Sequence, residues 1–436
     1  MRRALALGAT LAGAAAGRLP AQTIPEGSAA SHVEQAYRRT PSFRMDPFRH
    51  TAIPHWGLVF AVGGSGENNV LNLSDLGALR YLSDQDSLRA TDVLNLLGLI
   101  PKGSGLVGIG QGEGAVYLGG PLGRHISIGL SARGTGYGAF HLDDNIVSLL
   151  RDGNGARQDF SLGTSKGAGL ATAEAGAHAI LRFGPMGSPD GVRVNVGIGA
   201  RYLRPVFYAH ELSTLANGGT VRVTGDSISA NIAIEQALTR DPSQTARQGG
   251  TNIANDFLLR LEWPTSGLAF EALVANVGKV NIPLVERSDF RVNVSTTTLT
   301  VVQDSLDRSP GSSGFDLKRF TVRDTVTLQV TLPRVVRFTA SSWANRILQL
   351  DLSATMPVTG EFESPLAVDV GTTWRFIRTL PLRAGVILGG NQGIGYTGGV
   401  AIEGRTMFLQ LAGESLGGFF RSAKGLGARF ELGLFF

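Results

Sequence analysis

Polar and apolar residues alternate with a period of two along several long segments of the chain. In 192–202, valine, isoleucine, alanine and tyrosine occupy every second position, and arginine, asparagine and glycine lie between them. The segments 171–183, 348–356 and 366–375 repeat this pattern. A period of two places successive side chains on opposite faces of a β-strand, so each segment predicts a strand with one apolar and one polar face.

The length of these segments separates two classes of β-protein. These four segments run for 9 to 13 residues, whereas strands of soluble sandwiches usually have about 5 or 6 residues. A tilted strand that crosses a bilayer needs about 9–11 residues. Several strand segments also end in an aromatic residue, as the girdles of membrane barrels require: Tyr202, Trp374, Phe183 and Trp263. The pattern therefore favours a transmembrane barrel over a soluble sandwich.

The last segment of the chain, 428–436, gives the sharpest form of this signal. Every second residue counted back from Phe436 is apolar, and Arg429, Glu431 and Gly433 lie between them. A terminal aromatic on such a strand is what the assembly machinery of outer-membrane barrels recognises. We therefore expect the C-terminal strand ending in Phe436 to engage the barrel-assembly machinery, and the apolar faces to contact outer-membrane lipid.

Strand signals recur from residue 57 to the end of the chain, with 267–278 and 283–293 expected as separate strands. Barrels of this type usually contain an even number of strands, and about 14 is the expected number after neighbouring segments merge. The predicted fold class is all-β: a single transmembrane antiparallel β-barrel of about 14 strands, with short helices in long loops.

The connections between strands are of two kinds. Tight turns such as 121–123 contrast with the long connections 64–104 and 139–166. Two helices are expected inside the long connections, at 87–97 and 143–150, since each begins near a Ser or Asp cap and ends before a glycine. Long loops on one side and short turns on the other are typical of an outer-membrane barrel.

The N-terminal part has a different character. Residues 1–21 combine two arginines, an apolar stretch and small residues before Gln22, which predicts a cleaved signal peptide. Residues 22–55 contain aromatic residues without strand periodicity. Two interpretations stay open for this segment, a hatch inside the lumen or a tail on the periplasmic side, and the barrel itself is expected over 56–436.

Composition excludes several classes of function. The chain has 436 residues, a net charge of +5 and no cysteine. Its arginines are scattered rather than gathered in a stripe, which argues against a nucleic-acid partner. The lack of cysteine rules out disulfides, thiolate metal sites, a cysteine nucleophile and a lipid anchor on cysteine.

Short motifs that suggest chemistry are better explained by structure. The G-x-S-x-G pattern at 163–167 lies in a glycine-rich loop that leads into a strand, not between a strand and a helix. The glycines of 108–112 are followed by no βαβ unit. The paired aspartates at 84/86 and 143/144 are expected to cap short helices. We therefore expect no enzyme activity, no cofactor and no metal.

Charged residues on the polar faces of the predicted strands are the remaining candidates for a functional site. We expect these residues to line the lumen: Glu174, Arg182, Arg193, Arg201, Arg260, Glu262, Asp351, Asp369 and Arg375. Charges of both signs inside a barrel can line a path for solutes, or pair across it and fill it. Both alternatives stay open at this point.

Three short motifs resemble the fatty-acid-transporter (FadL/PorV-type) outer-membrane barrels. They are the hairpin at 257–279 with its Asn276-Val277-Gly278 step, the Leu-Pro opening of 332–338, and the segment from Leu380 onward. The resemblance spans roughly 160–436 and implies a barrel of about 14 strands, with uptake of hydrophobic solutes or a secretion-accessory role. The Asn-Pro-Ala step found near the mature N-terminus of that group is absent here.

The favoured function is a porin-like, FadL-like channel or transporter for small hydrophobic molecules in the outer membrane of a Gram-negative-type envelope. The alternative is a non-transporting structural or secretion-accessory barrel that binds an envelope partner through its loops. A soluble secreted β-protein is a third hypothesis. The sequence leaves the solute, the strand number to within about two and the oligomeric state open.

Overall fold

The computed structural model describes most of the strand-forming part of the chain. The described residues are 46–51, 55–72, 98–152, 159–161, 165–185, 191–213, 219–224, 227–296, 315–343, 347–358, 360–377, 379–391, 393–404 and 406–436. The expected signal peptide at 1–21 and the expected helix at 87–97 lie outside them, as does most of 22–55.

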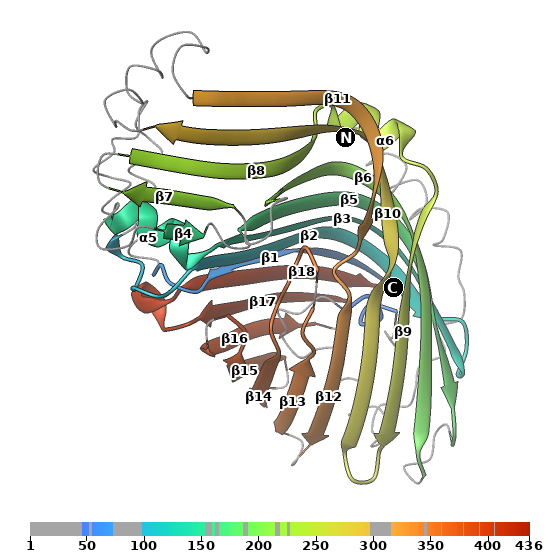
Figure 1. Ribbon diagram of the computed structural model, residues 1–436. Helices are drawn as coiled ribbons and strands as arrows, with labels where there is room; N and C mark the ends of the chain where they lie inside the picture. The colour runs from blue at the N-terminus through green and yellow to red at the C-terminus, as the bar shows by residue number, and fades with distance from the viewer. Residues whose placement is uncertain are drawn as a thin grey trace.

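Long antiparallel strands form the wall of a closed barrel (Figure 1). Within the described residues the ring has fourteen strands, and each pairs with the next: β1 (Gly57–Asn68), β2 (Leu106–Pro121), β3 (Ile126–Leu142), β5 (Lys166–Phe183), β6 (Arg193–Ser213), β9 (Asn252–Trp263), β10 (Leu268–Thr296), β12 (Val335–Trp343), β13 (Leu348–Thr355), β14 (Ala367–Ile377), β15 (Leu380–Gly389), β16 (Gly393–Glu403), β17 (Met407–Leu416) and β18 (Gly425–Phe435). The predicted fold class is confirmed.

The last strand closes the ring by pairing with the first. β18 runs antiparallel to β1 from the pair Gly57/Phe435 to the pair Glu67/Gly425. The backbone N–H of Phe436 also donates to the carbonyl of Trp56 at 2.9 Å. The terminal alternation that predicts a strand therefore belongs to the seam of the barrel.

The two ends of the barrel differ in their connections. The turn end carries short links such as 122–125 between β2 and β3 and 264–267 between β9 and β10. The loop end carries the long connections 69–105 and 143–165. The predicted helix at 143–150 lies in the second of these as α5 (Asp144–Asp152).

Strand β9 illustrates how the alternating sequence builds the wall. Phe257 and Leu259 are 47% and 46% exposed, whereas Arg260 and Glu262 are 4% and 6% exposed. Because successive side chains point to opposite faces, the apolar residues cover the outside of the barrel and the charged ones point inward. Among the described residues, no helix is long and apolar enough to cross a membrane.

The wall continues above the loop end as an extension of the sheet (Figure 1). Its strands are the distal half of β10 with β11 (Phe315–Thr331) and β8 (Ser227–Thr239), followed by β7 (Thr220–Thr224) and β4 (Asp159–Ser161). The short helix α6 (Pro242–Gln248) joins β8 to β9, and a 3-10 turn, η2 (Phe420–Ser422), joins β17 to β18.

The prediction of separate strands at 267–278 and 283–293 is wrong, since both belong to β10. The segment between the two predicted strands is not a loop but contains two bulges within one continuous strand. Asn276 and Leu284 have positive φ angles of 61° and 56°, and the pairing register shifts beside each of them. Such bulges bend a strand without ending it, so β10 leaves the barrel wall and enters the extension.

Candidate functional site

Within the part of the chain that the structure describes, Arg201 forms the centre of the largest ionic cluster inside the barrel. Its side chain is only 1% exposed. It donates to the two carboxylate oxygens of Asp256 at 2.7 and 2.8 Å and to Asn276 Oδ1 at 2.6 Å. A further hydrogen bond joins it to Glu174. Paired, fully hydrogen-bonded charges are the form in which ions can be buried.

A second layer of contacts completes this cluster. Arg133 Nε lies 2.6 Å from Glu174 Oε2, and the hydroxyl of Thr135 donates to the other carboxylate oxygen at 2.7 Å. His178 Nε2 lies 3.3 Å from Asp256. Asn276 gives the cluster a further donor, because its backbone N–H donates to Asp256 Oδ1 at 3.0 Å, while its side-chain amide donates to the carbonyl of Pro333 at 2.9 Å. We call these residues the Arg201 cluster.

A second cluster lies around Glu431 on the closing strand. Glu431 is fully buried and accepts from Arg429 Nε at 2.7 Å. Arg49 and His50 approach the same carboxylate at 3.6 Å. Arg429 also lies 3.9 Å from Glu113. We call these residues the Glu431 cluster.

Residues 46–51, which we call the lumen segment, cross the bore of the barrel. All six residues are buried. Their contacts lie on strands around the ring: Asp46 with Arg337 on β12 (3.4 Å), Phe48 edge-to-face with His178 on β5 (5.4 Å), Arg49 with Gln410 on β17 (2.6 Å), and His50 with Tyr117 on β2 (4.6 Å between rings). The lumen segment therefore bridges strands on opposite sides of the ring.

The other predicted site residues form smaller pairs on the inward faces of their strands. These pairs are Arg260 with Glu262 (2.6 Å) and Glu271 (3.6 Å), Arg383 with Asp351 (2.5 Å) and Asp369 (3.4 Å), and Arg375 with Glu403 (3.1 Å). Arg193 donates to the carbonyl of Pro185 at 3.3 Å, and the Arg182 amide donates to the carbonyl of His125 at 2.7 Å, both near the turn end. The structure thus brings Glu174 together with Arg201 and Arg260 together with Glu262. It also places Asp351 and Asp369 on one shared partner, Arg383. Arg182, Arg193 and Arg375 contact none of the other predicted residues in these pairs.

Several residues of these clusters are not among the site residues predicted from the sequence. Arg133, Asp256 and Arg383 lie on the polar side of β3, β9 and β15, so the period-two pattern contained a signal for them. Arg49 and His50 precede the first strand and carry no such signal.

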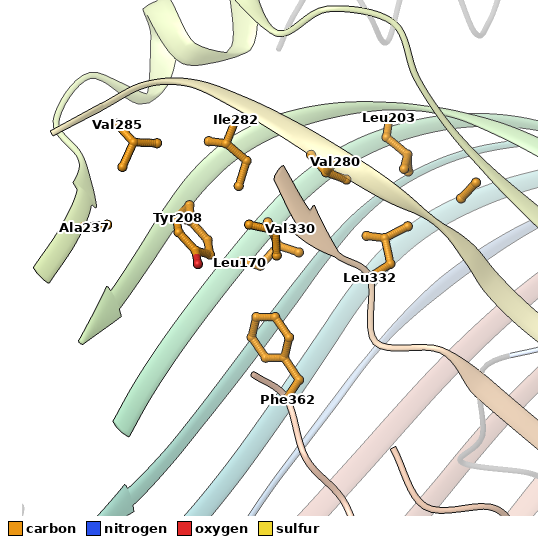
Figure 2. Close-up of a cluster of buried hydrophobic side chains, with 11 residues drawn as sticks. Leu170, Leu203, Tyr208, Ala237, Val280, Ile282, Val285, Val330, Leu332 and Phe362 are labelled. Atoms are coloured by element: carbon orange, nitrogen blue, oxygen red, sulfur yellow. The ribbon is translucent and has the colours of Figure 1, made fainter. Parts of the chain in front are cut away.

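The interior becomes apolar toward the loop end. The cluster drawn in Figure 2 combines inward-facing wall residues, the sheet extension and the β13–β14 connection, and we call it the apolar loop-end cluster. Its members are Leu170, Leu203, Tyr208, Ala237, Ala254, Val280, Ile282, Val285, Val330, Leu332 and Phe362. All are at most 6% exposed.

The β13–β14 connection, residues 356–366, reaches this cluster from another part of the ring. We call it the strap. The ring centroids of Phe362 and of Tyr137 on β3 lie 6.1 Å apart. Glu361 accepts from the hydroxyl of Tyr208 on β6 at 3.0 Å, and Glu363 lies 2.9 Å from Lys166 at the start of β5. A bridge between Val358 and Ser364 closes the strap into a narrow loop.

The described residues contain no group of three or more His, Asp or Glu that could hold a metal ion. The chemistry available in the lumen is therefore that of paired charges in the middle and an apolar region at the loop end.

Comparison with solved structures found barrels similar in overall fold. A mutant of TodX, a monoaromatic hydrocarbon channel, covers 90% of this chain and 94% of its own at 9% identity, with a TM-score of 0.45. A FadL homologue from Pseudomonas aeruginosa covers 94% of this chain and 98% of its own at 12% identity, with a TM-score of 0.43. The toluene transporter TodX of P. putida covers 90% and 93% at 8% identity, with a TM-score of 0.40.

No family model matches the sequence, and no curated protein matches it either. The structural neighbours are thus FadL- and TodX-type outer-membrane barrels, as the motifs at 257–279, 332–338 and 380 onward suggest, and the likeness is one of fold.

Proposed function

We propose that the protein is an outer-membrane channel for small hydrophobic solutes, which enter through the apolar loop-end cluster. The observation that carries this proposal is the change in character of the inward-facing side chains. They are apolar near the loop end and ionic in the middle of the barrel. An apolar molecule gains about 25 cal/mol for each Å² of surface that it buries in such a region, whereas an ion would lose its hydration there.

The channel rests in a closed state in this proposal. The lumen segment fills the bore and is held by contacts to β2, β5, β12, β17 and β18. Passage of a solute therefore requires this segment to move. A polar solute of sugar size has no open path past it. On this view 22–55 acts as a hatch, and the nine charged residues named from the sequence line or support the path.

The experiment measures uptake of the hydrophobic dye N-phenylnaphthylamine by cells that carry the protein in their outer membrane. We expect faster uptake than with empty vector, and slower uptake with Leu203→Asn, which places an amide in the apolar cluster. Leu99→Asn is the matched control, because Leu99 is 46% exposed at the loop end. Heat-modifiable migration on a gel shows that each variant is folded.

A second measurement addresses the size and polarity of the path. Liposomes that contain the purified protein should not swell when they are diluted into an arabinose solution, because in this proposal the lumen segment fills the bore. Swelling at the rate of a general porin would contradict the proposal. Dye uptake equal to that of empty vector would contradict it too.

The filled bore also favours a second candidate, a barrel that transports nothing and binds an envelope partner through its loops. The sheet extension at the loop end gives such a partner a surface beyond the membrane. The variant Phe48→Ala separates the two candidates. It removes the ring that packs on His178, so it should raise dye uptake in a gated channel and leave it at the vector level in a partner-binding barrel.

A further inference from the structure

A shallow cavity of about 320 Å³ is hollowed into the outer surface of the barrel wall, across β2, β3, β5 and β6. The glycines that line it occupy lipid-facing positions. Gly112 and Gly136 alternate with the inward-facing Glu113 and Thr135, which are each 4% exposed. The outside of the wall elsewhere carries large side chains, such as Leu350 and Leu352 at 48% exposure each.

The cavity exists because two rows of paired residues lack large side chains. One row is Gly112, Gly136 and Ala171, and the other is Gly110, Gly138 and Gly169. A Cβ atom added to Gly136 or Gly138 would meet nothing within 4 Å. Small residues in a membrane-facing surface let another molecule approach the backbone closely.

Phe207 forms the wall of the cavity on the β6 side. One carbon of its ring lies 3.6 Å from where a Cβ of Gly169 would stand. The cavity volume is at the lower end of the range for ligand pockets, about 300–1,000 Å³. It suits one flexible apolar chain rather than a whole lipid.

A basic group stands beside this cavity. Arg204 is exposed, lies on the outward face of β6 and pairs with Ala173, next to Ala171. Along β6 the outward residues run from Val196 and Ile198 through Tyr202 to Arg204, and Phe207 of the cavity follows on the loop-end side of Arg204. Neighbouring aromatic and basic residues are typical of the region where a membrane meets water.

A second arginine lies next to the first. Arg204 Nη1 donates to the carbonyl of Ala246 at 3.4 Å, and its guanidinium stands 5.9 Å from the Tyr202 ring centre. Arg247, the residue after Ala246, is exposed in the last turn of α6. Two exposed carboxylates lie nearby. Glu211 is on β6 farther toward the loop end, where it pairs with Gly167. Asp241 caps the start of α6, and its charge interacts with that of Arg247.

We propose that this surface binds a membrane lipid with a net negative phosphate head group. One acyl chain lies in the glycine-lined cavity, and the phosphate contacts Arg204 and Arg247. The positive charge beside an apolar groove at the membrane boundary selects this occupant over a neutral lipid or a second copy of the chain. Attraction of anionic lipid contributes about 1 kcal/mol for each basic residue near the membrane surface, which is about fivefold in binding.

Native mass spectrometry of the full-length barrel tests the proposal, with dioleoyl-phosphatidylglycerol and dioleoyl-phosphatidylcholine as probes. These lipids have identical chains and differ in net charge. We expect wild type to retain the anionic lipid preferentially, and Arg204→Gln and Arg247→Gln to lower that preference about fivefold each. Arg124→Gln removes an exposed arginine at the turn end of β2 and β3 and should leave the preference unchanged.

Gly136→Leu tests the cavity separately from the charge. A Cβ at this position would meet no atom within 4 Å, and the rest of the leucine would occupy the groove, so we expect a folded barrel that loses the bound lipid with either head group. Equal retention of both lipids by wild type would overturn the proposal, as would an equal loss of preference in Arg124→Gln. If wild type is a dimer that Gly136→Leu converts to a monomer, the surface is a contact between copies and the lipid site is refuted.

Discussion

Replacing Arg201 with alanine removes the cation that holds two buried carboxylates, and the structure indicates how much stability this should cost. Glu174 would keep Arg133 and the hydroxyl of Thr135 as partners. Asp256 would lose both of its guanidinium hydrogen bonds, the shorter at 2.7 Å, and keep the backbone N–H of Asn276 at 3.0 Å and His178 at 3.3 Å. Because only one carboxylate loses its main cation, and neither loses every partner, the loss lies near the lower end of the range for breaking a buried pair, about 3 kcal/mol.

Equilibrium unfolding in urea, followed by tryptophan fluorescence in lipid vesicles, measures this loss. A double-mutant cycle isolates the pair, because Arg201→Ala with Asp256→Ala removes the stranded charge as well. We expect the double variant to be more stable than the sum of the two single losses predicts, by about 1–3 kcal/mol. Arg421→Ala, at an exposed position in η2, should change stability by at most about 0.5 kcal/mol.

Two outcomes would refute this reasoning. A loss below about 1 kcal/mol for Arg201→Ala would mean that water reaches the Arg201 cluster and replaces the guanidinium, as at an exposed salt bridge. Strict additivity in the cycle would mean that the measured loss comes from packing of the arginine stem and not from its charge.

The other predictions concern the wall, the strap and the cap of α6. Gly199→Ala should lower stability by about 1–3 kcal/mol in the same urea titration, because its Cβ would lie 2.3 Å from a histidine ring carbon, whereas Gly136→Ala should not. In this chain without cysteine, Tyr208→Cys joined to Glu361→Cys by a short bis-maleimide should reduce dye uptake to the vector level, and uptake that is unchanged after cross-linking would show that the strap does not gate the path. Hydrogen bonds from Ser and Gln at the start of α6 lower the pKa of Asp241, so its cap is present above the usual value of 3.8 and is lost as the pH falls through the lowered pKa. The protection factors of the α6 amides, in which the intrinsic pH dependence of exchange is divided out, should therefore be equal at pH 7 and pH 5 and lower below about pH 3, and Asp241→Asn should abolish that difference.

The barrel could be predicted from the sequence because its determinant is local. A strand such as β9 must put apolar residues on its lipid side, and the resulting alternation of Phe257 and Leu259 with Arg260 and Glu262 can be read without knowing any neighbour. The same pattern placed Glu174 and Arg201 on polar faces. Register is not local, however, and it is the register between β6 and β9 that sets Arg201 opposite Ala254 and within reach of Asp256.

The lumen segment illustrates a different limit. Phe48 contacts residues more than a hundred positions away, and Asp46 pairs with Arg337 on the far side of the ring. None of these contacts produces a periodic pattern in 46–51, so the sequence alone does not distinguish a hatch from a periplasmic tail. The prediction of two separate strands in place of β10 is wrong for a related reason. The bulges at Asn276 and Leu284 have the composition of a loop, but the pairing resumes directly after each of them, with β9 at Val277 and with β11 at Val285.

The balance of charge inside the barrel bears on what it can transport. The Arg201 cluster contains two arginines, Arg133 and Arg201, and two carboxylates, Glu174 and Asp256, bonded to one another at close range. Such a cluster leaves little field along the axis, whereas ion-selective pores present rings of one sign to the path. A lumen of this kind gives an ion no compensation for its lost hydration. A neutral molecule has no such hydration to lose, and the apolar loop-end cluster offers it a place to bury its surface. The pairing of charges that fills the middle of the barrel thus argues against conduction of ions, and it is compatible with a hydrophobic solute that passes when the lumen segment moves.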